Sequence, residues 1–116
     1  MKLKITSLLF VLMLFAAYPA HGQTTPRRIE ITAKKFDYVP SNITLKKDEP
    51  VVIVLKSMDA AHGLRFRELG FNVRASKGQT SEAEFTPTKT GDFVGQCSVF
   101  CGSGHGGMKL TLHVVE

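Results

Sequence analysis

The sequence lacks the motifs that mark the common nucleotide-binding and hydrolytic enzymes. It has no P-loop, no dinucleotide-binding glycine pattern and no serine nucleophile elbow. It also has no tryptophan and only two cysteines. Its positive charges form no block of the kind that binds nucleic acid, so we expect no nucleic-acid partner. With 116 residues, the chain has room for one small domain, which excludes most multidomain enzymes.

The composition that is present indicates a folded, mildly basic domain. Fifteen Lys and Arg against ten Asp and Glu give a formal net charge of +5, and hydrophobic residues, eight Phe among them, make up 43% of the chain. This hydrophobic content favours a packed core over disorder. Any chemistry must therefore lie on one compact scaffold.

The start of the chain has the pattern of a secretion signal. Two lysines come first, the stretch 5–17 is apolar, and small residues up to Gly22 suit a signal peptidase. We predict cleavage after Gly22, with residues 1–22 as the signal peptide and 23–116 as the mature domain. An uncleaved anchor is the alternative, but about 13 apolar residues fall short of the ~20 that span a bilayer. The mature chain is therefore expected in the periplasm or outside the cell, with no stable membrane span.

Short runs with strand character follow one another along the mature chain. Apolar and polar residues alternate over 29–34 and 109–116, whereas 51–55 is the β-branched apolar run of a buried strand. About seven strands at intervals of roughly 8–12 residues predict an all-β, antiparallel β-sandwich. His113 lies opposite the apolar side of its strand and is expected to face solvent. The stretch 68–76 stays open between a loop and a helical turn.

The segment that ends at Met108 carries the chemistry. Its pattern is Cys-x3-Cys-x3-His-x2-Met, made by Cys97, Cys101, His105 and Met108. Four glycines interrupt it, so it is predicted to be a loop between the last two strands rather than a helix. Thiolate and thioether ligands with imidazole select copper over magnesium, calcium or manganese. A further strong donor is needed, and His62, which follows the buried strand after a short turn, is its expected source.

Other uses of these side chains stay open. In an oxidising compartment the two cysteines can form a disulfide. Zinc accepts two Cys and two His in tetrahedral sites. A mononuclear type 1 copper site needs only one thiolate. It would use His62, Cys101, His105 and Met108 and leave Cys97 as a bystander.

Two segments of the chain resemble parts of a known copper domain. The segment from Cys97 to Met108 looks like the dinuclear copper (CuA) loop of cytochrome c oxidase subunit II and nitrous oxide reductase. The stretch Ser57-Met58-Asp59-Ala60-Ala61-His62-Gly63-Leu64 is similar to the segment that supplies the first histidine of that family. The resemblance extends from Arg28 to Glu116 and implies a cupredoxin-like sandwich with Greek key connections.

The resemblance also implies a site for two copper ions. Cys97 and Cys101 would be thiolates that bridge the two coppers. One copper would take His62 and a weak axial Met108, and the other would take His105 and the backbone carbonyl of Val99. A rigid loop that holds such ligands in place in either oxidation state suits one-electron transfer. The implied role is an electron-transfer component of an oxidase-like system, with no catalytic residue and no enzyme activity by itself.

Departures from the subunit II pattern shape the expected role. Val99 stands where many subunit II sequences have Glu, and the chain lacks both a tryptophan to receive electrons and the transmembrane hairpin of subunit II. We therefore expect a free-standing exported relative whose partner is a redox protein, such as a c-type cytochrome or an oxidase or reductase core. A type 1 copper protein and a periplasmic copper carrier or assembly factor stay open as alternatives.

Overall fold

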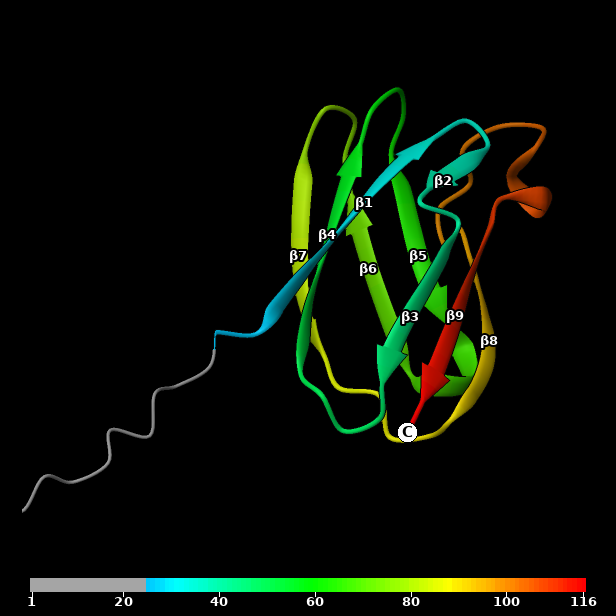
Figure 1. Ribbon diagram of the computed structural model, residues 1–116. Coiled ribbons are helices and arrows are strands. Elements are labelled where there is room, and N and C mark those ends of the chain that lie inside the picture. Colours follow the sequence, from blue (N-terminus) through cyan, green and yellow to red (C-terminus); the bar gives the residue numbers. More distant parts are fainter. Residues whose placement is uncertain (1–24) are drawn as a thin grey trace, which may run out of the picture.

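The computed structural model describes residues 25–116, which form two β-sheets packed face to face (Figure 1). The strands are β1 (Arg27–Lys34), β2 (Asp37–Val39), β3 (Asn42–Lys46), β4 (Val51–Ser57), β5 (His62–Phe66), β6 (Phe71–Ala75), β7 (Thr80–Phe85), β8 (Gly91–Gln96) and β9 (Lys109–Val115). Two short 3-10 helices, η1 (Arg67–Leu69) and η2 (His105–Gly107), complete the fold. No helix in this part of the chain has the length and apolar character needed to cross a membrane. The predicted signal peptide lies outside the described residues.

The predicted all-β sandwich is confirmed, but its sheets are mixed rather than wholly antiparallel. The first sheet has the order β2-β1-β4-β7 and the second the order β3-β9-β8-β5-β6. β1 pairs with β4, and β3 with β9, in parallel register. The reason is the path of the chain: β3 lies in the second sheet, so β4 re-enters the first sheet beside β1 and in the same direction.

The structure has more strands than the sequence predicted. β6 occupies most of the stretch 68–76, and its side chains alternate between buried and exposed. Phe71, Val73 and Ala75 face the core, a pattern that five residues were too few to make evident. β2 has only three residues, and a strand that short is too brief to show an alternation of apolar and polar residues in the sequence.

The core lies between the two sheets and consists of the inward side chains of alternate positions. In β9, for example, Leu110, Leu112 and Val114 are buried while their neighbours are not. Each such side chain stabilises the fold by about 1.5–3 kcal/mol. Ala83 and Phe85 of β7 pack against the core and are partly buried. The packed core fixes the ends of the strands, and these ends hold the loops in place.

The connections that matter for the site lie at one end of the sandwich, the upper end in Figure 1. They are the turn from β1 to β2, the turn from β4 to β5 and the loop 97–108 between β8 and β9. The last two contain or adjoin every residue predicted to bind metal. The predicted loop between the final two strands is thus confirmed.

Candidate metal centre

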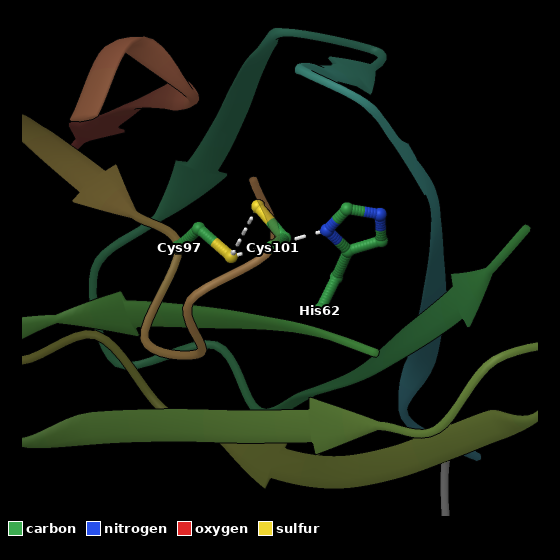
Figure 2. A group of neighbouring side chains, drawn as sticks. All are labelled: His62, Cys97 and Cys101. Atoms are coloured by element: carbon green, nitrogen blue, oxygen red, sulfur yellow. Dashed lines mark hydrogen bonds between the residues drawn. The ribbon is translucent and has the colours of Figure 1, made fainter. Parts of the chain in front are cut away.

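A histidine and two cysteines form the centre of the site (Figure 2). The ligand atoms of His62, Cys97 and Cys101 all lie within 4.8 Å of one another, and the three residues are buried. The Sγ atom of Cys97 lies 3.9 Å from Nδ1 of His62 and 3.7 Å from Sγ of Cys101. Both cysteines are free. With metal–sulfur bonds of about 2.3 Å, as in zinc–thiolate sites, two sulfur atoms at this separation could both bind one ion.

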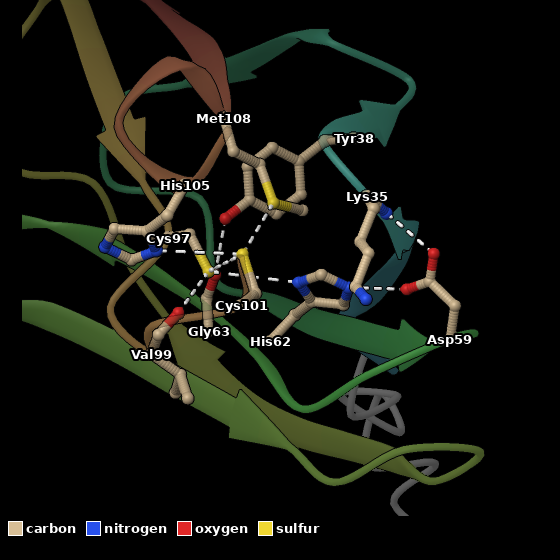
Figure 3. A network of polar contacts seen from close by, with 10 residues as sticks. All are labelled: Lys35, Tyr38, Asp59, His62, Gly63, Cys97, Val99, Cys101, His105 and Met108. Carbon is tan, nitrogen blue, oxygen red and sulfur yellow. Dashed lines mark hydrogen bonds and ion pairs between the residues drawn. The ribbon is translucent and has the colours of Figure 1, made fainter. Parts of the chain in front are cut away.

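The other predicted ligands surround the two sulfur atoms (Figure 3). Nδ1 of His105 lies 3.6 Å, and Sδ of Met108 lies 3.9 Å, from Sγ of Cys101. The thiol of Cys97 donates to the carbonyl oxygen of Val99 at 3.1 Å. The structure therefore brings the six predicted site residues together, each with its donor atom close to a cysteine sulfur.

The loop 97–108 is held closed by its own backbone. The N–H of Cys97 donates to the carbonyl of Met108 at 3.3 Å, which joins the two ends of the loop where β8 and β9 meet it. Within the loop, the N–H of His105 donates to the carbonyl of Gly102 at 3.1 Å. Gly102 has φ +136°, and a Cβ atom there would lie 3.0 Å from the ring of Phe36. The loop therefore packs against the turn between β1 and β2 and needs glycine at this point.

Asp59 is a member of the site that sequence reasoning missed. Its Oδ1 lies 2.8 Å from Nε2 of His62, and its Oδ2 accepts a hydrogen bond of 2.9 Å from the N–H of Lys35. Both contacts lower the pKa of the Asp59 carboxyl, the His62 contact most. The only sequence signal was its position three residues before His62, inside the segment that carried the family resemblance.

Tyr38 is a second missed residue, and no sequence signal pointed to it. It is 2% exposed, and its hydroxyl donates to the backbone carbonyl of Gly63, the residue after His62. Burial and the nearby cysteines raise the pKa of the Tyr38 phenol. The phenol therefore stays neutral and acts as a hydrogen-bond donor beneath the site.

The surroundings of the two thiols separate their pKa values. Burial opposes ionisation of Cys97, but the hydrogen bonds to its sulfur, that from the Gly63 backbone most, outweigh it and lower the pKa to about 7. For Cys101, burial and the neighbouring Cys97 raise the pKa to about 11. Cys97 is therefore the more readily ionised of the two thiols, and the thiolate is the form that binds a metal.

One side of the site reaches the surface. His105 is half-buried, and its ring centroid lies 5.6 Å from that of Phe100, whose side chain is 79% exposed. His113, by contrast, lies away from the site on the outer face of the second sheet. Its Nδ1 is 2.6 Å from Oδ1 of Asp92, and its side chain is 37% exposed. The prediction that His113 faces solvent is in keeping with this position.

The donor set suits a soft metal ion. Two thiols, two imidazoles and a thioether around one point are ligands that copper prefers, and four of them also suit zinc. Oxygen ligands are confined to the Val99 carbonyl among the predicted residues, which disfavours magnesium and calcium.

Comparison with known sequences identifies the family of the chain and shows curated relatives. The cupredoxin-like domain family matches residues 5–108. A probable cytochrome c oxidase subunit 2 from Rickettsia prowazekii is 30% identical over 90 residues, which cover 78% of this chain and 29% of that protein. The chain therefore spans less than a third of the length of this relative.

Comparison with solved structures supports the fold. The periplasmic domain of cytochrome oxidase subunit II of Bradyrhizobium japonicum is similar with a TM-score of 0.70 and 22% identity, over 78% of this chain and 84% of that one. The metal binding domain of the Cu(I) exporting P-type ATPase of Streptococcus pneumoniae, solved with Cu(I), has a TM-score of 0.63 and 26% identity, over 77% and 85%.

Proposed function

The chain belongs to the cupredoxin-like domain family and is a relative of cytochrome c oxidase subunit 2, and from this premise we propose that it is an exported copper-binding domain that transfers single electrons through a dinuclear CuA-like site. Residues 1–22 are the signal peptide in this proposal, and residues 23–116 are the mature domain in the periplasm or outside the cell. The observation that carries the proposal is the pair of free, buried thiols with donor groups on both sides.

The distribution of these donors supports two ions rather than one. Of the donors for the first copper, His62 lies beside Cys97 and Met108 lies beside Cys101. For the second, the Val99 carbonyl lies beside Cys97 and His105 beside Cys101. Each copper would thus find one terminal donor near each sulfur, as expected when both ions share both thiolates. A single ion would leave two of these four donors without a role.

The residues around the site would keep the ligands in place during electron transfer. When bound, the copper pair supplies the group that accepts and releases one electron. The Cys97–Met108 backbone hydrogen bond closes the loop, and the contact of Phe36 with the glycine-rich part of the loop limits its motion. Burial of the thiols excludes water from them. A site that changes little between oxidation states needs little reorganisation, which favours fast transfer.

The partner in this proposal is a redox protein, such as a c-type cytochrome or an oxidase or reductase core. Support comes from the curated relative, which is a probable oxidase subunit, and from the exposed ring of Phe100 beside His105. An exposed aromatic side chain next to a predicted ligand offers a partner a contact close to the metal.

A copper carrier is the second candidate function. One observation favours it: the chain is 26% identical to a metal binding domain solved with Cu(I) from a Cu(I) exporting ATPase. A carrier must release its metal, whereas an electron carrier must keep it. Rapid loss of copper to a chelator would favour delivery, and slow loss would favour electron transfer.

Electron paramagnetic resonance of the copper-loaded, partly oxidised protein tests the proposal. A hyperfine pattern from one electron shared by two equivalent coppers is the expected result. A pattern from a single copper would support a type 1 or delivery site instead. Absence of any copper signal, with Cys97 and Cys101 oxidised to each other, would overturn the proposal.

A further inference from the structure

The contact between Asp59 and His62 determines which ring nitrogen carries the proton. His62 is fully buried, and its Nε2 lies 2.8 Å from Oδ1 of Asp59. An ionised carboxylate can only accept hydrogen bonds. An imidazole with a single ring proton in this contact therefore carries it on Nε2, which leaves the lone pair on Nδ1. That atom lies 3.9 Å from Sγ of Cys97.

Asp59 is itself held from a second direction. Its Oδ2 accepts a hydrogen bond from the backbone N–H of Lys35, just after β1. The adjacent residue, Met58, donates its N–H to the carbonyl of Ala33 in β1 at 3.0 Å. The turn that carries Asp59 is thus joined to β1 by one side-chain and one backbone hydrogen bond. The carboxylate cannot rotate away from His62 without breaking its contact with the backbone.

The second predicted imidazole ligand has no such support. Within the part of the chain that the structure describes, the one polar contact of the His105 ring is that of Nδ1 with Sγ of Cys101. The ring also packs beside Phe100. It is also half-buried, whereas His62 is fully buried. The two histidines are therefore unequal: a carboxylate holds the ring of His62, whereas among the described residues no carboxylate is hydrogen-bonded to His105.

We propose that Asp59 is the positioning residue that selects the tautomer of His62 and aims Nδ1 at the sulfur pair, so that the His62 side of the site is assembled before copper arrives. The copper part of this inference rests on the proposed function. The tautomer part does not, because it concerns only the metal-free protein. Carboxylate partners of this kind orient histidine ligands and raise their basicity.

Nitrogen NMR of the copper-free protein tests the tautomer directly. We expect His62 to carry its proton on Nε2 in the wild type. In the Asp59→Ala variant the ring should populate both tautomers, because the acceptor is gone. In Asp59→Asn the amide oxygen can still accept from Nε2, so the wild-type tautomer should largely return. A wild-type ring protonated on Nδ1, or an unchanged single tautomer in Asp59→Ala, would overturn the proposal.

Competition for Cu(I) against a chromophoric chelator tests the consequence for binding. Loss of an outer partner of a histidine ligand costs about 10–100-fold in metal affinity, and we expect a loss of this size for Asp59→Ala and a smaller loss for Asp59→Asn. Asp92→Ala is the matched control, since it removes the same type of contact from His113, remote from the site. It should leave the affinity unchanged within about twofold.

The outcomes separate this inference from the proposed function. Thermal unfolding of the copper-free variants shows whether Asp59→Ala is folded when its affinity is measured. Equal affinities for wild type and folded Asp59→Ala would overturn the positioning role even if the wild type shows the expected copper spectrum. A wild type that binds no Cu(I) would overturn the proposed function, and the NMR experiment would still decide the role of Asp59.

Discussion

The hydroxyl of Tyr38 donates a hydrogen bond to the backbone carbonyl of Gly63, the residue next to His62 (Figure 3). This contact joins β2, in the first sheet, to the start of β5, in the second sheet. Tyr38 is buried and far from His62 in sequence. The position of a predicted metal ligand therefore depends on a side chain from the opposite sheet.

Replacement of Tyr38 tests the strength of this contact. Tyr38→Phe keeps the ring and removes only the donor. We expect the free energy of unfolding to fall by about 1–2 kcal/mol, because a buried carbonyl loses its partner. Chemical denaturation of the copper-free protein measures the change. An unfolding free energy equal to that of the wild type would show that the hydrogen bond contributes nothing to stability.

The different roles proposed for Cys97 and Met108 give a second prediction. Cys97→Ser should abolish the shared-electron spectrum, since only one thiolate would remain to bridge the metals. Met108→Leu should keep both coppers bound and change the reduction potential, because it removes only a weak axial ligand. Paramagnetic resonance and metal analysis read out both variants. If Cys97→Ser retains the parent spectrum, bridging by Cys97 is wrong.

Alkylation of the copper-free protein gives a third prediction. Both thiols are 6% exposed, so the two differ little in access. The pKa of Cys97 is about 7 and that of Cys101 about 11. A lowered pKa means more thiolate at a given pH, so at pH 8 iodoacetamide should modify Cys97 first. Its rate should fall as the pH drops below 7, while Cys101 reacts appreciably only at much higher pH.

Peptide mass spectrometry identifies the modified cysteine at each time point. Prior loading with copper should protect both residues, which serves as the control for specific binding. Equal rates at the two cysteines at pH 8 would contradict the separation of their pKa values.

The glycines of the loop give a fourth prediction. Gly102→Ala introduces a Cβ atom at a positive φ and 3.0 Å from the ring of Phe36. We expect a loss of about 1–3 kcal/mol in the free energy of unfolding, from backbone strain and crowding. Gly106→Ala is the matched control, because no atom lies near its added Cβ. Denaturation curves that are equally shifted for the two variants would show that the conformation of Gly102 is not needed.

The predicted ligands could be read from the sequence because most of them lie close together in it. Cys97, Cys101, His105 and Met108 occupy 12 residues, and a loop between adjacent strands can bring such residues to one point. His62 was expected from the turn that precedes it. These predictions required only local order and the succession of strands, whereas the Val99 carbonyl was implied by the family resemblance alone.

The supporting contacts could not be read in this way. Asp59 meets the backbone of Lys35 across 24 positions, and Tyr38 meets Gly63 across 25. The Tyr38 contact joins the two sheets and the Asp59 contact joins two turns, and no period or spacing in the sequence encodes either contact. The parallel pairing of β1 with β4 was missed for the same reason, since it depends on which sheet β3 enters.

The pairing of the strands has a consequence for how this domain can change over time. β8 and β9, which flank the loop 97–108, and β5, which begins at His62, all belong to the second sheet. Tyr38 and the Lys35 backbone belong to the first sheet or its turn. Substitutions in the first sheet would therefore alter the surroundings of the proposed ligands without removing one of them. A lineage could in this way vary the domain around an unchanged set of candidate ligands.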